Sequence, residues 1–139
     1  MIVRAFLPAD IPAVRELWSA TDGLGFGPGD AHVELESFLA RNPGLSPVAV
    51  SDDVLVGALL CGHDGRRGCL YRLAVAASHR RRGVAGQLVR HALDGLRAAG
   101  IPRALLYVLA DNAPAAAFWK SIGGRIRGEL DMFSIDLAP

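Results

Sequence analysis

The sequence predicts a single α/β domain of the α+β class over residues 1–139, with helices flanking a mixed, mostly antiparallel central sheet. Two observations predict this class. Short apolar runs separated by turn residues occupy the middle of the chain, as in strands joined by hairpins. A longer segment, residues 84–99, repeats its apolar residues at helical spacing. A chain of 139 residues can bury one hydrophobic core.

The first part of the chain predicts a strand at residues 2–7 and two helices. Asp10 is expected to cap a helix over residues 11–20, and Asp30 a second helix that ends near Arg41. The inward side chains are expected to be Ile11, Val14, Leu17 and Trp18 in the first helix, and Val33, Leu35 and Phe38 in the second.

Glycines and short turns organise the next part. The segment 23–29 holds four glycines and a proline, so it is expected to be a mobile or ligand-shaped loop. Strands are predicted at 48–50 and 54–60, joined by a tight turn at Asp52-Asp53, and a further strand at 69–76 follows a second turn.

The last part predicts alternating strands and helices. Gly100 and Pro102 end the long helix, and residues 104–109 predict a buried strand. A short helix is expected from Pro114 to Ser121. In the closing segments, 125–130 and 132–137, apolar and polar residues alternate as in the two strands of a hairpin.

The start of the long helix carries a charge pattern that conflicts with local rules. Arg80, Arg81 and Arg82 precede Gly83 at the helix N-terminus, which bears roughly half a positive charge and favours acids. A bound anion resolves the conflict, because amides of the first turn point at it and Gly83 lets the backbone approach.

Charge is also unevenly distributed along the chain. Residues 66–103 hold nine arginines and one acid, whereas the whole chain has 15 basic and 14 acidic residues. This asymmetry indicates an anionic partner for the middle of the chain. The alternative is a solvated helix face combined with arginine-rich codon usage, since Lys120 is the only lysine.

Location and metal content are constrained by what the sequence lacks. No apolar run approaches the roughly 20 residues of a membrane span, and the N-terminus has no secretory layout, so a cytoplasmic protein without membrane contact is expected. Cys61 and Cys69 are expected to be reduced, with a cross-strand disulfide as the alternative. His63 lies near Cys61, but no second ligand pair has metal spacing, so no metal site is expected.

The order of elements and four motifs resemble the GNAT superfamily of acetyl-CoA-dependent N-acyltransferases across nearly the whole chain. The motifs are Leu73-Ala74-Val75, Arg80-Arg81-Arg82-Gly83-Val84-Ala85, Asn112 and Ala117-Phe118-Trp119-Lys120-Ser121-Ile122-Gly123. The turn at 63–68 also resembles a small bacterial subgroup of this superfamily. The resemblance implies the GNAT fold, with the sheet splayed at the CoA site.

The resemblance also implies acetyl-CoA as cosubstrate and a set of residues that hold it. Amides near Arg81 to Gly86 would cradle the pyrophosphate. Backbone groups of the splayed strand would hold the pantetheine arm, with Asn112 on its other side, and the Val75 amide would stabilise the oxyanion. The expected cofactor-binding residues are Leu73, Ala74, Val75, Arg80, Arg81, Arg82, Gly83, Val84, Ala85, Gly86, Asn112 and Trp119.

Two departures leave the general acid and base unassigned. Trp119 occupies the position of the family's acidic tyrosine, and its indole N–H can donate a hydrogen bond but has no usable acidity. Tyr71 and Arg72 stand where many members place a carboxylate base. His63, Asp64, Tyr71 and Tyr107 are substitutes, with ordinary roles in turns and strand packing as the alternative.

The predicted function is direct acetyl transfer from acetyl-CoA to a primary amine on a small molecule or peptide. The alternative is a CoA-binding or nucleic-acid-binding module without turnover. Aromatic residues are few and not interleaved with the basic run, so no nucleic acid partner is expected. The sequence leaves a homodimer open.

Acidic residues predict the charge of the acceptor. In the GNAT fold the loop between the first two helices and the closing hairpin flank the amine-entry side. An acidic entry would attract cationic amines, although these acids also fit helix caps and solvated faces. The residues are Asp22, Asp30, Glu34, Glu36, Glu129 and Asp131.

Overall fold

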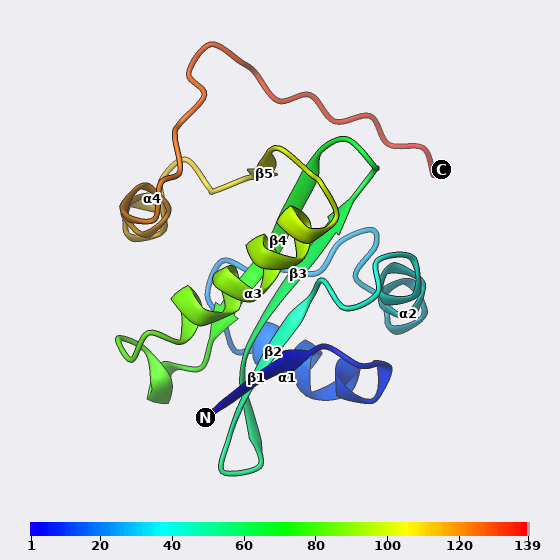
Figure 1. The fold of residues 1–139 in the computed structure, drawn as a ribbon, viewed down its shortest axis with the longest axis vertical. Helices are drawn as coiled ribbons and strands as arrows, with labels where there is room; N and C mark the ends of the chain where they lie inside the picture. The colour runs from blue at the N-terminus through cyan, green and yellow to red at the C-terminus, as the bar shows by residue number, and fades with distance from the viewer. Residues whose placement is uncertain (139) are drawn as a thin grey trace. The chain divides into compact units, whose positions relative to one another are not determined.

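The computed structural model describes residues 1–138, and the chain divides into two compact units, Met1–Tyr107 and Val108–Pro139 (Figure 1). The first unit contains the sheet. The second contains the helix α4 (Ala113–Ser121) followed by an irregular tail. The expectation of one domain over residues 1–139 stays a prediction. No helix within residues 1–138 combines the length and apolar character needed to cross a membrane.

Five strands form one sheet in chain order: β1 (Ile2–Ala5), β2 (Pro47–Ser51), β3 (Val54–His63), β4 (Gly68–Val75) and β5 (Ala104–Leu106). The first four are antiparallel to their neighbours, and β5 runs parallel to β4. The predicted mixed, mostly antiparallel sheet flanked by helices is confirmed. In the β2–β3 turn, Asp52 and Asp53 both have positive φ, 49° and 62°, as a type I′ hairpin turn requires.

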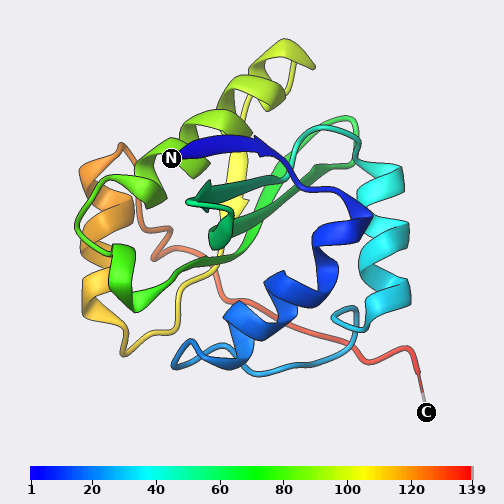
Figure 2. The ribbon, with the colours of Figure 1, turned by 90° about the horizontal axis from the view of Figure 1, so that it is seen from below.

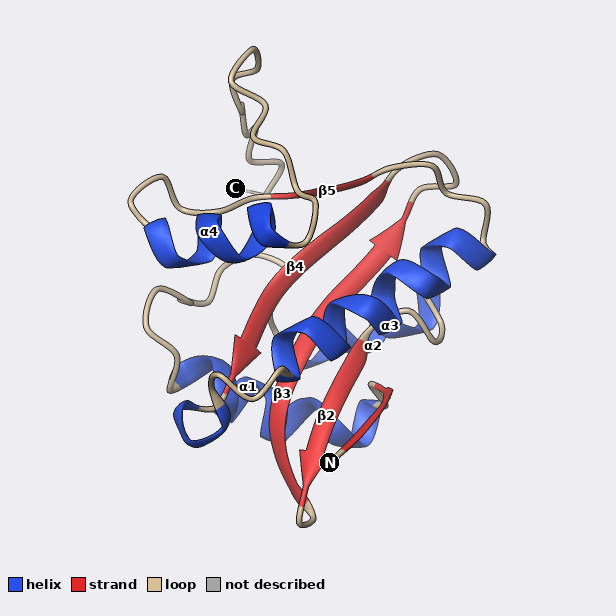
Figure 3. Cartoon of the chain, turned by 60° about the vertical axis from the view of Figure 1, so that its left-hand side comes forward, coloured by secondary structure: helices blue, strands red, loops and turns tan. Residues whose placement is uncertain are grey.

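Helices cover both faces of the sheet in the first unit (Figures 2 and 3). α1 (Ile11–Ser19) and α2 (His32–Arg41) pack on one face, and α3 (Val84–Ala98) packs on the other. The α1–α2 face meets the core cluster of Val48, Ala58, Leu60 and Ala74 from β2, β3 and β4. Two short 3₁₀ helices, η1 (Pro8–Asp10) and η2 (Ala77–His79), complete the unit.

The α3 face depends on a small residue in β3. A Cβ atom added to Gly57 would lie 3.0 Å from a methyl carbon of Leu88 and 3.1 Å from one of Val84. The first turn of α3 therefore lies directly on the strand. The apolar face predicted for this helix is buried at Val84, Leu88, Ala92 and Leu96 and exposed at Ala99.

Three details of the helical half differ from expectation. α2 buries Leu35 and Leu39, which share one face at i, i+4 spacing, whereas Val33 lies off that face and is 68% exposed. Asp30 does not cap α2, because Ala31 stands at the N-cap and its N–H donates to Glu34. Asp10 likewise accepts hydrogen bonds from Arg4 and the Leu7 N–H instead of capping α1.

The end of the chain forms less sheet than predicted. β5 stops at Leu106 and Leu109 is exposed, so the expected strand at 104–109 is wrong in its second half. The expected hairpin at 125–130 and 132–137 is absent from the described residues. Its apolar side chains are 60–94% exposed at Leu130, Met132, Phe133, Ile135 and Leu137. Alternation creates an apolar strand face, but a strand also needs a hydrogen-bonding partner, and none pairs with this segment.

The two cysteines lie on adjacent strands but face opposite sides of the sheet. Cys61 is opposite Leu70, and Cys69 is opposite Gly62, so their positions differ by one residue in register. Both thiols are free. Burial raises the pKa of the Cys61 thiol to about 12, which keeps it protonated and unreactive.

Candidate functional site: an open strand edge and a cationic helix start

The outer edge of β4 is open beyond its first three residues. β5 pairs with β4 only at Gly68–Leu70, so residues 71–75 have no strand on that side within the described chain. The pairing with β3 is interrupted between Ala58 and Leu60, and Arg72 in β4 has a φ of 58°. This bulge turns the second half of β4 away from β5. We call residues 71–75 the open edge.

The register assigns a direction to the Val75 backbone. The N–H of Ala76 donates to the Val56 carbonyl at 2.8 Å, and neighbouring residues of an antiparallel strand point their polar groups to opposite sides. The N–H and carbonyl of Val75 therefore point away from β3, toward the open edge. The carbonyl accepts a hydrogen bond from Arg80 Nε at 3.2 Å, which leaves the N–H as the free group.

The loop into α3 has the features of an anion site. Arg81 and Gly83 have positive φ, 62° and 79°, and Gly83 stands at the N-cap of α3. The first N–H of the helix to form an i to i−4 hydrogen bond is that of Gln87, which donates to the Gly83 carbonyl at 3.2 Å. The amides of residues 81–86 have no protein acceptor within the described chain. A run of such amides at a helix N-terminus binds anions.

The structure thus brings most of the predicted cofactor residues into one unit. The first unit holds the strand residues Leu73, Ala74 and Val75 and the whole loop from Arg80 to Gly86. Arg80 differs from expectation, because its Nε donates to the Val75 carbonyl and is not available to an anion. Asn112 and Trp119 belong to the second unit.

In the second unit, Asn112 and Trp119 have local roles in α4. The Asn112 side-chain oxygen caps the helix by accepting from the Ala115 N–H at 3.1 Å. Trp119 is half-buried and packs edge-on against Phe118. The N–H of Gly124 donates to the Trp119 carbonyl at 2.8 Å, and a Cβ atom on Gly124 would lie only 2.7 Å from that oxygen. The close approach of the chain to this helix end therefore requires glycine at position 124.

The proposed acids and bases are mostly engaged in structure. Asp64 accepts from the N–H groups of Arg67 and Arg66, and these bonds lower its pKa, which weakens it as a base. His63 Nδ1 accepts from the Gly65 N–H in the same turn. Burial raises the pKa of Tyr71, so its phenol stays protonated near neutral pH and cannot act as a base.

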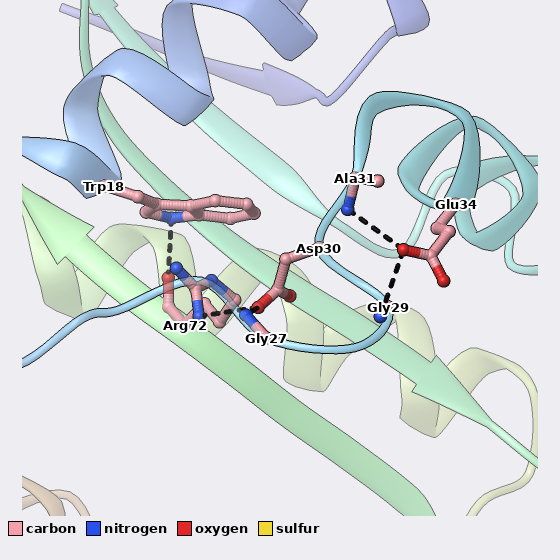
Figure 4. Close-up of polar contacts among 7 residues, drawn as sticks. All are labelled: Trp18, Gly27, Gly29, Asp30, Ala31, Glu34 and Arg72. Atoms are coloured by element: carbon pink, nitrogen blue, oxygen red, sulfur yellow. Dashed lines mark hydrogen bonds and ion pairs between the residues drawn. The ribbon is translucent and has the colours of Figure 1, made fainter. Parts of the chain in front are cut away.

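A cluster of Trp18, Asp30 and Arg72 that sequence reasoning did not identify lies at the open edge (Figure 4). The backbone carbonyl of Arg72 accepts a hydrogen bond from Trp18 Nε1 at 3.2 Å. The side-chain Nη1 of Arg72 donates to the Asp30 carboxylate at 3.2 Å. The guanidinium carbon lies 4.3 Å from the centre of the Trp18 ring. Burial lowers the pKa of Arg72, and Asp30 opposes that shift. A positive φ at arginine cannot be predicted from the sequence, because glycine, asparagine, aspartate and histidine are the residues that favour that conformation.

Most of the acids expected at the amine entry have internal partners. Asp30 pairs with Arg72, and Glu129 pairs with Arg127 at 2.6 Å. Glu34 accepts from two backbone N–H groups of the loop, and Glu36 contacts His32. These contacts reduce the field that an acidic entry would present to a cationic acceptor. No three His, Cys, Asp or Glu side chains within residues 1–138 are grouped as a metal would require.

The sequence is similar to an established family. A model described as the acetyltransferase (GNAT) family matches residues 11–123. An acetyltransferase from Photorhabdus laumondii is 37% identical over 112 residues, covering 81% of this chain and 78% of that protein. One from Pectobacterium atrosepticum is 33% identical over 122 residues, covering 88% and 86%.

Solved structures share the fold at low sequence identity. Ard1 from Thermoplasma volcanium has a TM-score of 0.78 at 22% identity, covering 88% of this chain and 80% of that chain. The ribosomal-protein-S18-alanine N-acetyltransferase from Escherichia coli has a TM-score of 0.70 at 21% identity, covering 88% and 76%. AAC(6')-Iy in complex with a CoA-containing bisubstrate analogue has a TM-score of 0.76 at 19% identity, covering 97% of each chain.

Proposed function

The chain belongs to the acetyltransferase (GNAT) family, and we propose that it transfers the acetyl group of acetyl-CoA directly to a primary amine. One observation carries this proposal most strongly. The free amides of residues 81–86 and the free Val75 N–H lie on the two segments that flank η2, all within the first unit. An anion site and an oxyanion donor are the two features that a CoA thioester requires.

Each segment has a role in the proposed reaction. The amides of the α3 start bind the pyrophosphate, with Arg81 and Arg82 neutralising its charge. The open edge binds the amide-containing pantetheine arm by strand-like hydrogen bonds. The Val75 N–H donates to the thioester oxygen as it gains negative charge. The amine nitrogen forms the new C–N bond, the C–S bond breaks, the amine proton passes to water, and the thiolate leaves.

Cell compartment and partners follow from the same proposal. A cytoplasmic enzyme fits the two free cysteines, because cytosolic thiols are kept reduced. The acceptor is a small molecule or peptide amine, with no nucleic acid or membrane partner. A homodimer would be recognised from the molar mass of the purified protein, measured by light scattering.

The test is turnover with a panel of primary amines. The purified protein is mixed with acetyl-CoA and each amine, free thiol release is followed, and the N-acetyl product is identified by mass spectrometry. The control for each amine is its N,N-dimethyl form, which cannot give a stable amide. We expect amine-dependent thiol release together with the acetylated product. Binding of acetyl-CoA without amine-dependent release across the panel would instead support a CoA-binding module without turnover.

A further inference from the structure

Two arginines share one aromatic ring on the α1–α2 side of the sheet. The guanidinium carbon of Arg15 lies 5.0 Å from the centre of the Phe26 ring, and that of Arg72 lies 5.4 Å from the same centre. Arg72 also stacks on Trp18. Asp30 is the carboxylate that pairs with Arg72, and no acid is paired with Arg15 within the described chain. The cluster therefore has more positive than negative charge.

Three donors of this cluster are buried and have no partner within the described chain: Arg72 Nε, Arg72 Nη2 and Arg15 Nε. The Nη1 group of Arg72 is used by Asp30. In a planar guanidinium, Nε and Nη2 lie along one edge and point their hydrogens the same way. A carboxylate bridges this edge with two parallel hydrogen bonds. Unsatisfied buried donors are rare in folded proteins, so a cluster of three calls for an acceptor.

The cluster lies beside the open edge of β4. Arg72 is three residues before Val75, which is roughly 10 Å along a strand. Its positive φ breaks the alternation of the strand, so that Tyr71, edge-on to Phe38 of α2, and Arg72, stacked on Trp18 of α1, both face the helices. A molecule whose carboxylate binds Arg72 can therefore extend toward Val75.

The ring that stacks on both arginines lies at the surface of the first unit. Phe26 is 46% exposed, and the two guanidinium groups beneath it are partly buried. The loop around it is tied by backbone donors, since the Gly27 N–H donates to Asp30 at 2.9 Å and the Gly29 N–H donates to Glu34 at 3.2 Å. The contacts that hold Arg72, from Asp30 and from the Trp18 indole, do not involve the Phe26 side chain.

We propose that Arg72, assisted by Arg15, binds a carboxylate of the acceptor, so that the acceptor is an amine that also carries a carboxylate, such as an amino acid or a peptide with a free acid. This inference rests on the proposed acetyl transfer and specifies its substrate class. It replaces a purely cationic acceptor with a zwitterionic one.

Transfer is tested with paired acceptors. The probes are the ω-amino acids from glycine to 6-aminohexanoate, each compared with its carboxamide at constant ionic strength. We expect at least one acid to exceed its carboxamide tenfold or more in kcat/KM. We expect Arg72→Gln to remove that preference, because kcat/KM for the acid should fall ten- to hundredfold further than kcat/KM for the carboxamide, as loss of a charged, two-bond contact does.

A second variant and a control protect this test against misfolding. Arg15→Gln is expected to reduce the preference three- to tenfold, and it leaves the Arg72 contacts with Trp18 and Asp30 in place. Arg90→Gln, an exposed position on α3, is expected to change neither rate. Equal rates for every acid and its carboxamide in the parent protein would overturn the inference.

Binding without turnover separates this inference from the proposed function. Tryptophan fluorescence is titrated with 6-acetamidohexanoate and with its carboxamide, neither of which can accept an acetyl group. A saturable change is expected for the acid alone, because Trp18 stacks on Arg72, and it should disappear in Arg72→Gln and require a three- to tenfold higher acid concentration in Arg15→Gln. Acid-specific binding without acetylation of any probe would contradict the proposed function and support the site. Acetylation without acid-specific binding would contradict the site and support the function.

Discussion

Trp18 of α1 holds Arg72 of β4 in two ways. Its indole Nε1 donates to the Arg72 carbonyl at 3.2 Å, and its ring lies 4.3 Å from the guanidinium carbon of the same residue. Trp18 is fully buried. One side chain therefore fixes both the backbone of the bulge that opens β4 and the position of the arginine beside it.

Loss of this contact should destabilise the first unit. Trp18→Phe keeps an aromatic ring but removes the donor and leaves a void, so we expect the free energy of unfolding to fall by about 2–3 kcal/mol. Urea unfolding measures the change. Trp119→Phe, at the other tryptophan, which is only half-buried, is the matched control and should cost less than about 1 kcal/mol. Equal losses in the two variants would show that the Trp18–Arg72 contact contributes nothing of its own.

The Arg4–Asp10 pair should make stability depend on pH in the acid range. Hydrogen bonding by Arg4, at 2.8 and 2.9 Å, lowers the pKa of Asp10 in the folded protein. The stabilisation is complete above the pKa of the unfolded carboxyl, near 3.9, and is lost as pH falls through the lower folded value. We expect Asp10→Asn to cost about 1 kcal/mol at pH 6 and progressively less below about pH 4. A cost that stays constant down to pH 2.5, measured by urea unfolding, would contradict this assignment.

Trp119 allows a test of how the thiolate leaves. If it leaves unprotonated or is protonated by water, Trp119→Phe should change kcat less than about threefold, because the indole has no usable acidity. Trp119→Tyr should raise kcat by supplying a donor of tunable pKa. Both are measured as kcat by thiol release, with acetyl-CoA affinity as the control. A loss beyond about a hundredfold in Trp119→Phe at unchanged affinity would show that the indole N–H stabilises the transition state.

The elements that the sequence predicted well are those with strong local signals. Arginines before Gly83 conflict with the helix dipole, and the structure has a helix start with free amides there. The Asp52-Asp53 turn and the stripe of α3 follow from turn chemistry and helical spacing. Each of these depends on residues close together in the sequence.

The features that were missed depend on distant residues. Aspartate is a common helix-capping residue and Asp30 stands just before α2, yet it pairs with Arg72, which is 42 residues away in the chain. The bulge at Arg72 is held by Trp18 across 54 residues. The closing segment alternates correctly for a hairpin, but alternation does not specify a pairing partner. Local patterns cannot predict contacts that tertiary structure creates.

The central claim is that the loop from Arg80 to Gly86 binds acetyl-CoA. The direct measurement is the shift in melting temperature that acetyl-CoA causes in the parent protein, Arg81→Glu, Gly83→Val and the control Arg90→Glu. A ligand that binds only the folded state stabilises it by about 2.7 kcal/mol at a hundred times Kd. We predict a shift of several degrees in the parent and control and none in Arg81→Glu or Gly83→Val, which reverse a charge and place a β-branched residue at a φ of 79°. An unchanged shift in both loop variants would contradict the account.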